Sequence, residues 1–141
     1  MTLYYRSLKN WKYQTTALYV HQTPIYGHDV STPWIRLNAE GQLIIQPGYC
    51  WDGASGPTWD SPCSMRGSLV HDAIFQLIRL NLLPLNIKPI ADLLFHDILI
   101  DDGMSRIRAY IWYRAVKLFG GGSCVPGSEQ PEQILVSGRD L

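Results

Sequence analysis

The sequence predicts an α+β fold, in which an N-terminal antiparallel β-meander precedes a C-terminal three-helix antiparallel bundle. With 141 residues, of which 46% are hydrophobic, the chain is long enough to bury one core, so we expect a single domain. Apolar residues stand in short runs between Gly, Pro, Asn and Asp over residues 1–50, but recur at helical spacing over 62–120. Between these parts we expect a Gly/Pro-rich loop at 51–62, and after them an extended tail at 121–141.

Three short runs of β-branched, aromatic and aliphatic residues predict the strands. They lie at 18–21, 34–37 and 42–45. The Asn-Ala-Glu-Gly sequence at 38–41 suits a tight turn whose glycine takes a positive φ. The last two strands should therefore form a hairpin.

The loop between the two halves combines glycine and proline with two tryptophans, Trp51 and Trp59. Such a segment cannot hold a regular element, but its large indoles can anchor it. We expect an ordered loop. Within the tail, residues 134–136 are suited to an edge strand.

The first predicted helix begins with Ser61 as its cap and Pro62 in its first position, and it should stop near Asn81. Pro89 should start the second helix, which should end at 101–103.

Ser105 should cap the third helix, which the glycines at 120–122 should end. Short connections make neighbouring helices antiparallel. The side chains expected to face the core are Leu69, Val70, Ala73, Ile74, Leu77 and Ile78, then Ile90, Leu93, Leu94 and Ile98, then Ile107, Ile111, Ala115, Val116 and Phe119.

Charge and cysteine content argue against several classes of protein. Twelve Lys and Arg balance twelve Asp and Glu, so neither nucleic acid nor an anionic membrane is an expected partner. Three cysteines without a CxxC pair disfavour a zinc knuckle and a disulfide framework, and their odd number favours a reducing compartment. The sequence shows neither the apolar stretch of a signal peptide nor a run of about 18 apolar residues, so no transmembrane segment is expected.

His71 and Asp72 place an imidazole beside a carboxylate in the middle of the first predicted helix. A hydrogen-bonded core histidine is the commoner explanation, and it stays open. However, Asp92 and His96 share one face of the next helix, and an antiparallel hairpin could bring that face against His71. A carboxylate on one ring nitrogen fixes the tautomer and leaves the other nitrogen to take a proton from water. We therefore predict His71 as a general base that Asp92 orients.

Asp72 should point about 100° around the helix from His71, towards the loop that contains Asp52. There the two carboxylates and loop carbonyls could hold a hard cation such as Ca²⁺. A cap or an ion pair explains Asp72 equally well. A transition-metal site that adds His96 and Asp97 is disfavoured, because the helical half has no third histidine.

Ser55 is a weak candidate for a nucleophile. It lies in Gly-Ala-Ser-Gly, whereas the hydrolase elbow is G-x-S-x-G between a strand and a helix. A hydrogen bond from Ser55 to Asp52, or a helix cap, is the simpler expectation.

Several stretches of the chain carry a family resemblance. They are GYCWDGASGP at 48–57, LVHDAIF at 69–75, Ala-Asp-x-x-Phe at 91–95 and Tyr-x-Ala-Val at 113–116, followed by Gly120. Over about residues 13–120 the chain resembles the domain-of-unknown-function family numbered 1353, which is seen mainly in tailed phages and prophages. The resemblance implies that its polar signature positions belong to one constellation, namely Asp52, Ser55, His71, Asp72 and Asp92.

The His71-Asp72-x-x-Phe75 sequence is also similar to the catalytic helix of secretory phospholipases. In those enzymes an antiparallel helix supplies a second Asp to the histidine, which activates water, while its neighbouring Asp binds calcium with a glycine-rich loop. This chain lacks their dense disulfides, the cysteine pair before the histidine and their calcium-loop glycines. The likeness is therefore as consistent with convergence or coincidence as with descent.

Two functions are expected, of which the first is the leading one and the second its alternative. The first is a phage-encoded hydrolase in which His71, Asp92 and Ser55 are catalytic and Asp72 and Asp52 hold Ca²⁺ or the substrate. The substrate stays open among esters, amides and the peptidoglycan of the host cell envelope. The second is a non-catalytic tail- or baseplate-associated virion protein with other phage structural proteins as partners, which five Trp and eight Tyr suit. An intracellular effector is a third. Synthesis in the host cytoplasm is expected, with incorporation into the virion under the second function.

Overall fold

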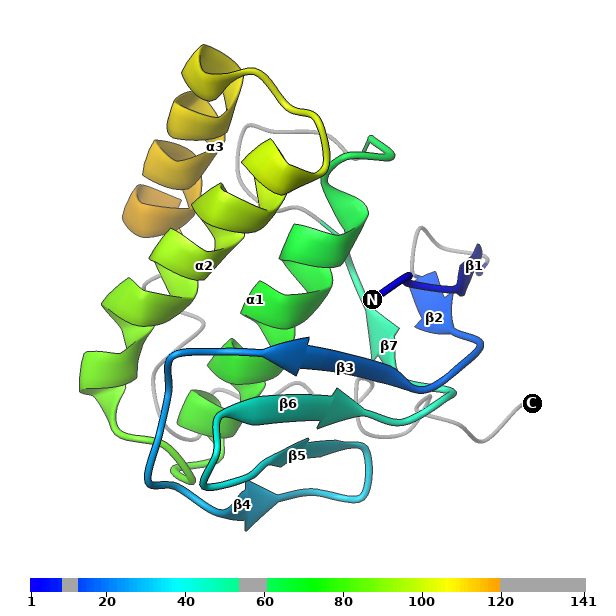
Figure 1. Ribbon diagram of the computed structural model, residues 1–141, viewed down its shortest axis with the longest axis vertical. Helices are drawn as coiled ribbons and strands as arrows, with labels where there is room; N and C mark the ends of the chain where they lie inside the picture. The colour runs from blue at the N-terminus through cyan, green and yellow to red at the C-terminus, as the bar shows by residue number, and fades with distance from the viewer. Residues whose placement is uncertain (9–12, 54–60, 120–141) are drawn as a thin grey trace. The chain divides into compact units, whose positions relative to one another are not determined.

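The computed structural model describes residues 1–8, 13–53 and 61–119 (Figure 1). These residues divide into two compact units, the first within Met1–Asp52 and the second within Gly53–Ser128. The described strands all belong to the first unit and the described helices to the second. The α+β class is therefore confirmed, and the division falls close to the predicted change at residue 51.

Among its described residues, the first unit has two antiparallel sheets where the sequence predicted a single meander. The strands are β1 Tyr5–Ser7, β2 Tyr13–Thr15, β3 Tyr19–Gln22, β4 Val30–Ser31, β5 Ile35–Leu37, β6 Gln42–Ile45 and β7 Cys50–Trp51. One sheet has the order β1-β2-β7 and the other β3-β6-β5-β4. Trp51 does not open the loop as predicted, because it pairs with Tyr13 as the last residue of β7.

The predicted hairpin is present between β5 and β6, where Leu37 lies opposite Leu43. Gly41 takes a φ of 85°, and the Asn38 side chain accepts a hydrogen bond of 2.9 Å from the backbone N–H of Gln42. A Cβ on Gly41 would lie 2.5 Å from the carbonyl oxygen of Thr23. Only glycine fits this turn, which explains why the sequence pattern located it correctly.

The described part of the second unit contains three helices and one 3₁₀ turn. They are α1 Met65–Arg79, η1 Leu85–Ile87, α2 Lys88–Asp101 and α3 Arg106–Phe119. The predicted start of α1 is wrong: the backbone N–H and the hydroxyl of Ser64 each donate a 2.9 Å hydrogen bond to the carbonyl of Ser61, which closes a turn around Pro62 before the helix begins. The predicted cap of α3 is confirmed, since the Arg108 N–H donates to the Ser105 hydroxyl at 3.2 Å.

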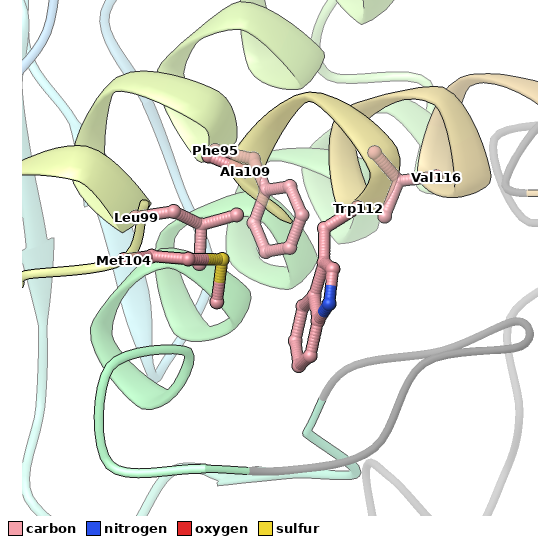
Figure 2. Close-up of a cluster of buried hydrophobic side chains, with 6 residues drawn as sticks. All are labelled: Phe95, Leu99, Met104, Ala109, Trp112 and Val116. Atoms are coloured by element: carbon pink, nitrogen blue, oxygen red, sulfur yellow. The ribbon is translucent and has the colours of Figure 1, made fainter. Parts of the chain in front are cut away.

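The helices pack in chain order, α1 on α2 and α2 on α3. A Cβ on Gly67 of α1 would lie only 3.2 Å from the Phe95 ring of α2, so these two helices approach closely. Figure 2 shows the apolar cluster that joins α2 to α3; its members are Phe95, Leu99, Met104, Ala109, Trp112 and Val116. No helix in the described ranges has the length and apolar character needed to cross a bilayer.

The predicted core faces are right for α1 and partly wrong for the other two helices. All six predicted α1 side chains are buried. On α2, Leu93 is exposed. On α3, Ile107 and Ile111 are exposed, because this helix has apolar side chains on two faces and the larger side chain of Trp112 occupies the core. Apolar spacing alone could not choose between these faces.

Candidate functional site

His71 of α1 and Asp92 of α2 form the centre of the site. The two helices are antiparallel neighbours, and this brings the Nε2 atom of His71 to 2.7 Å from Oδ1 of Asp92. Only 4% of His71 and 1% of Asp92 is exposed. The predicted hydrogen bond between His71 and Asp92 is present, but it is buried between the two helices.

Asp72 occupies the other side of the imidazole. Its Oδ1 atom lies 3.7 Å from Nδ1 of His71, which is the distance of an ion pair, and its side chain is 30% exposed. Both ring nitrogens of His71 thus face carboxylates. The expectation that one nitrogen is left free is therefore wrong.

Lys88 is a member of the site that the sequence analysis missed. Its Nζ atom lies 2.7 Å from Oδ2 of Asp92, one helical turn further along α2. The i,i+4 spacing of a lysine and an aspartate was the available signal. With Lys88, the group contains two basic and two acidic side chains: His71, Lys88, Asp72 and Asp92.

Aromatic rings surround the histidine. The Phe75 ring centroid lies 3.9 Å from that of His71 and the Phe95 centroid 5.4 Å from it, while Lys88 Nζ lies 5.8 Å from the Phe75 centroid. Rings exclude water, so the charges interact through a medium of low polarity.

Opposing forces set the protonation of the pair. Burial disfavours a charged imidazole, but hydrogen bonds and charges from Asp72 and Asp92 raise the pKa of His71 above its ordinary 6.5. Burial also acts against a charged Asp92, yet contact with His71 and Lys88 lowers the pKa of this carboxyl below its ordinary 3.8. Both pKa shifts favour an imidazolium paired with a carboxylate below pH 6.5. An imidazolium has no lone pair with which to accept a proton, so in this state it is not a general base.

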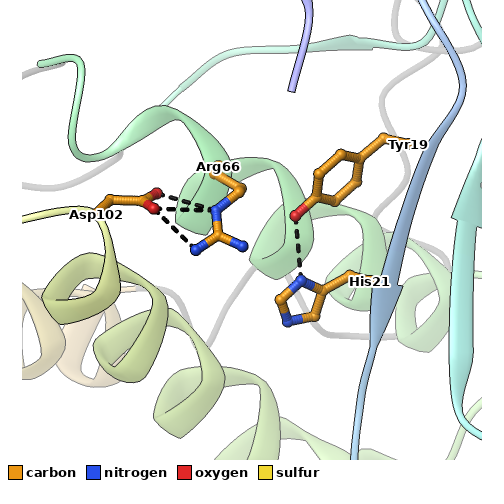
Figure 3. A network of polar contacts seen from close by, with 4 residues as sticks. All are labelled: Tyr19, His21, Arg66 and Asp102. Atoms are coloured by element: carbon orange, nitrogen blue, oxygen red, sulfur yellow. Dashed lines mark hydrogen bonds and ion pairs between the residues drawn. The ribbon is translucent and has the colours of Figure 1, made fainter. Parts of the chain in front are cut away.

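A second polar link joins the same two helices, between Arg66 at the start of α1 and Asp102 at the end of α2. Figure 3 shows the guanidinium of Arg66 donating hydrogen bonds to the carboxylate of Asp102. The Nε atom lies 3.1 Å from both carboxylate oxygens, and Nη2 lies 2.8 Å from Oδ1. Asp102 does not simply end α2 in solvent, because its side chain is 23% exposed and pairs with Arg66.

Two further histidines of the described ranges, His21 and His96, have hydrogen-bond partners of their own. Figure 3 also shows the Tyr19 hydroxyl next to His21 on β3, with Nδ1 3.1 Å from the oxygen. His96 pairs with Asp97 at 3.0 Å and places its ring 5.7 Å from that of Tyr113 on α3.

The predicted cation site is only partly described. Asp72 lies in the helical unit, whereas Asp52 is an exposed residue at the end of the first unit. Ser55, Trp59 and the loop carbonyls of 54–60 lie outside the described residues, as do the tail and Cys124. Within the described part of the chain, no three His, Cys, Asp or Glu side chains form a group that could hold a metal. The Ca²⁺ site stays a prediction.

Comparisons with protein-family models, with curated proteins and with solved structures found no match.

Proposed function

We propose that this chain is a non-catalytic interaction protein in which four side chains form an ionic clamp between α1 and α2. The ionic clamp consists of His71, Asp72, Lys88 and Asp92. The observation that carries this proposal is that both ring nitrogens of a 4% exposed histidine face carboxylates. Such an imidazole is suited to holding helices together and poorly suited to activating water.

The setting of this protein is proposed from its resemblance to a phage family. The WDGAS and HDAIF stretches support a component of a tail or baseplate that is made in the host cytoplasm and contacts other phage structural proteins. Exposed aromatic side chains at Tyr4, Tyr26 and Tyr110 support a binding role, because aromatic residues are enriched at protein interfaces. In this proposal the three helices act as one antiparallel bundle.

Replacing the clamp by apolar side chains tests the non-catalytic role. A buried ion pair can often be exchanged for well-packed hydrophobic residues without loss of stability. We expect the triple variant His71→Leu, Lys88→Met, Asp92→Leu to fold, as judged by circular dichroism, and to restore plaque formation by a phage that lacks this gene. A folded triple variant that restores nothing would contradict the proposal.

A hydrolase is the second candidate, which the 2.7 Å contact between His71 and Asp92 favours. It requires His71 to become neutral, and a Ca²⁺ ion that draws Asp72 away from Nδ1 would lower the pKa of the ring. In that state Asp92 would orient His71 towards water, with Ser55 and Asp52 near the substrate.

The calcium requirement makes this candidate testable. Millimolar Ca²⁺ should raise the melting temperature of the wild type and not that of Asp72→Asn, because only an ion bound to the folded state stabilises it. An unchanged melting temperature in both proteins would remove the calcium-assisted hydrolase.

A further inference from the structure

Helix α3 presents a second apolar face that points away from its core. Four large apolar side chains are mostly exposed there: Ile107 78%, Tyr110 55%, Ile111 58% and Leu118 66%. At about 100° per residue, they fall within one stripe roughly 100° wide. The opposite side of the helix carries Trp112 and Val116, which are buried in the cluster of Figure 2. We call these four exposed side chains the α3 stripe.

The charged residues of α3 are all cationic. Its sequence RIRAYIWYRAVKLF contains four of the twelve Lys and Arg residues of the chain and no Asp or Glu. Arg114 lies within the α3 stripe, Arg106 and Lys117 lie along one edge of it, and all three are exposed. The zero net charge of the chain, which argued against an anionic partner, therefore conceals a local surplus on one helix.

The outward side of α2 differs in charge. It also exposes a leucine, Leu93, but the exposed charged residues beside it are Asp97 and Asp101. Apolar exposure alone is thus common to α2 and α3, and of these two described helices only α3 combines it with exposed cations.

This combination identifies the partner by its chemistry. A second copy of α3 would oppose cations with cations, and an apolar protein groove would bury Arg114 in the middle of the stripe. At a lipid headgroup layer, in contrast, the long arginine side chain can reach phosphate while its neighbours enter the acyl boundary, and tyrosine is favoured at that depth. We propose that α3 lies flat on the surface of a bilayer that contains anionic lipids, with the α3 stripe inserted.

Co-sedimentation of the full chain with vesicles tests this proposal. The probes are vesicles of phosphatidylcholine alone and of phosphatidylcholine with 30% phosphatidylglycerol, each at low and high salt. We expect the wild type to sediment with the anionic vesicles at low salt and to be released by salt, since screening weakens the attraction.

Exposed-residue variants locate the contact. Ile107→Ser and Ile111→Ser should each weaken binding to anionic vesicles about tenfold, because each removes an inserted apolar side chain. Arg114→Gln should weaken it about fivefold. Leu93→Ser on α2 is the matched control and should bind as the wild type does; circular dichroism should show all four variants folded.

Two results would overturn the membrane proposal. The first is a wild type that does not bind anionic vesicles at low salt, and the second is an equal loss of binding in Leu93→Ser and Ile107→Ser. If the first result is found and the α3 variants also fail to restore plaque formation, the α3 stripe is assigned to a protein partner.

Discussion

The two polar links between α1 and α2 use similar chemistry in different surroundings. Arg66 and Asp102 meet where α1 begins and α2 ends, with side chains 18% and 23% exposed. His71 and Asp92 meet further inside the hairpin, with side chains 5% and 2% exposed. When the Arg66–Asp102 link breaks, water can solvate its charges. The charges of the buried His71–Asp92 link are stabilised by their protein partners instead.

This difference explains why the interior link needs four residues. A lone buried ion pair often loses more by desolvation than it gains by attraction, unless other groups satisfy the remaining charges. Lys88 takes the second oxygen of Asp92, and Asp72 faces the second nitrogen of His71. The ionic clamp is thus balanced in charge, while Arg66 and Asp102 form a bidentate pair at a more exposed place.

The largest expected effect comes from removing one charge of the clamp. Asp92→Asn keeps the shape of the side chain but leaves His71 and Lys88 without their shared carboxylate. We expect a loss of about 3–5 kcal/mol in the free energy of unfolding, measured by urea denaturation.

Asp97→Asn on the same helix is the control for this substitution. Its side chain is 70% exposed, so the change should stay within about 0.5 kcal/mol. If Asp92→Asn and Asp97→Asn lost the same free energy of unfolding, the ionic clamp would stabilise the fold no more than an exposed ion pair does.

The second effect is a pH dependence that only the clamp should confer. Because folding raises the pKa of His71, its contribution to stability is complete below pH 6.5 and is lost as pH rises through the pKa of the folded state. Because folding lowers the pKa of Asp92, its contribution is present above pH 3.8 and is lost at lower pH. Stability should therefore be highest between these values.

Above pH 6.5 the free energy of unfolding should fall by up to about 1.4 kcal/mol per pH unit. Urea denaturation from pH 5 to 8 measures this slope. His71→Gln should lose the slope, and a slope that survives in this variant would assign it to other groups.

A smaller effect is expected at the other link. Asp102→Asn makes the same chemical change as Asp92→Asn, but at a partly exposed pair. We expect a loss of about 1 kcal/mol, also from urea denaturation. If Asp102→Asn lost as much free energy of unfolding as Asp92→Asn, the buried and the partly exposed link would stabilise the fold equally, which contradicts this account.

Salt should produce the smallest effect. Raising NaCl from 0.05 to 1 M screens charges near water more than buried ones, so the difference between wild type and Asp102→Asn should shrink by a few tenths of a kcal/mol. The difference between wild type and Asp92→Asn should stay constant. If salt instead reduced the difference between wild type and Asp92→Asn, the charges of the ionic clamp would be accessible to water.

Local chemistry made parts of the fold predictable. Gly41 had to follow Asn38 in a turn that only glycine fits, and Ser105 could cap α3 from its own position in the chain. The pairing of β2 with β7 joins residues 13 and 51, and no local pattern encodes such a distant partner. The same limit affected α3, where apolar spacing marked two faces and tertiary packing chose that of Trp112.

The sequence was sufficient to predict the contact between His71 and Asp92, but not the protonation state of the His71 ring. The positions of His71 and Asp92 on neighbouring antiparallel helices were enough to bring them together. The state of the ring depends on burial and on Asp72 facing the second nitrogen, and both are properties of the packed structure.

Nuclear magnetic resonance of ¹⁵N-histidine-labelled protein tests the central claim most directly, because the shifts of the two ring nitrogens report whether each carries a proton. Comparison with His71→Gln assigns the signals of His71. We predict that both nitrogens of His71 are protonated at pH 6 and that its pKa lies above 6.5. A His71 ring that is neutral at pH 6, with one nitrogen free of a proton, would contradict the ionic clamp and restore the general base.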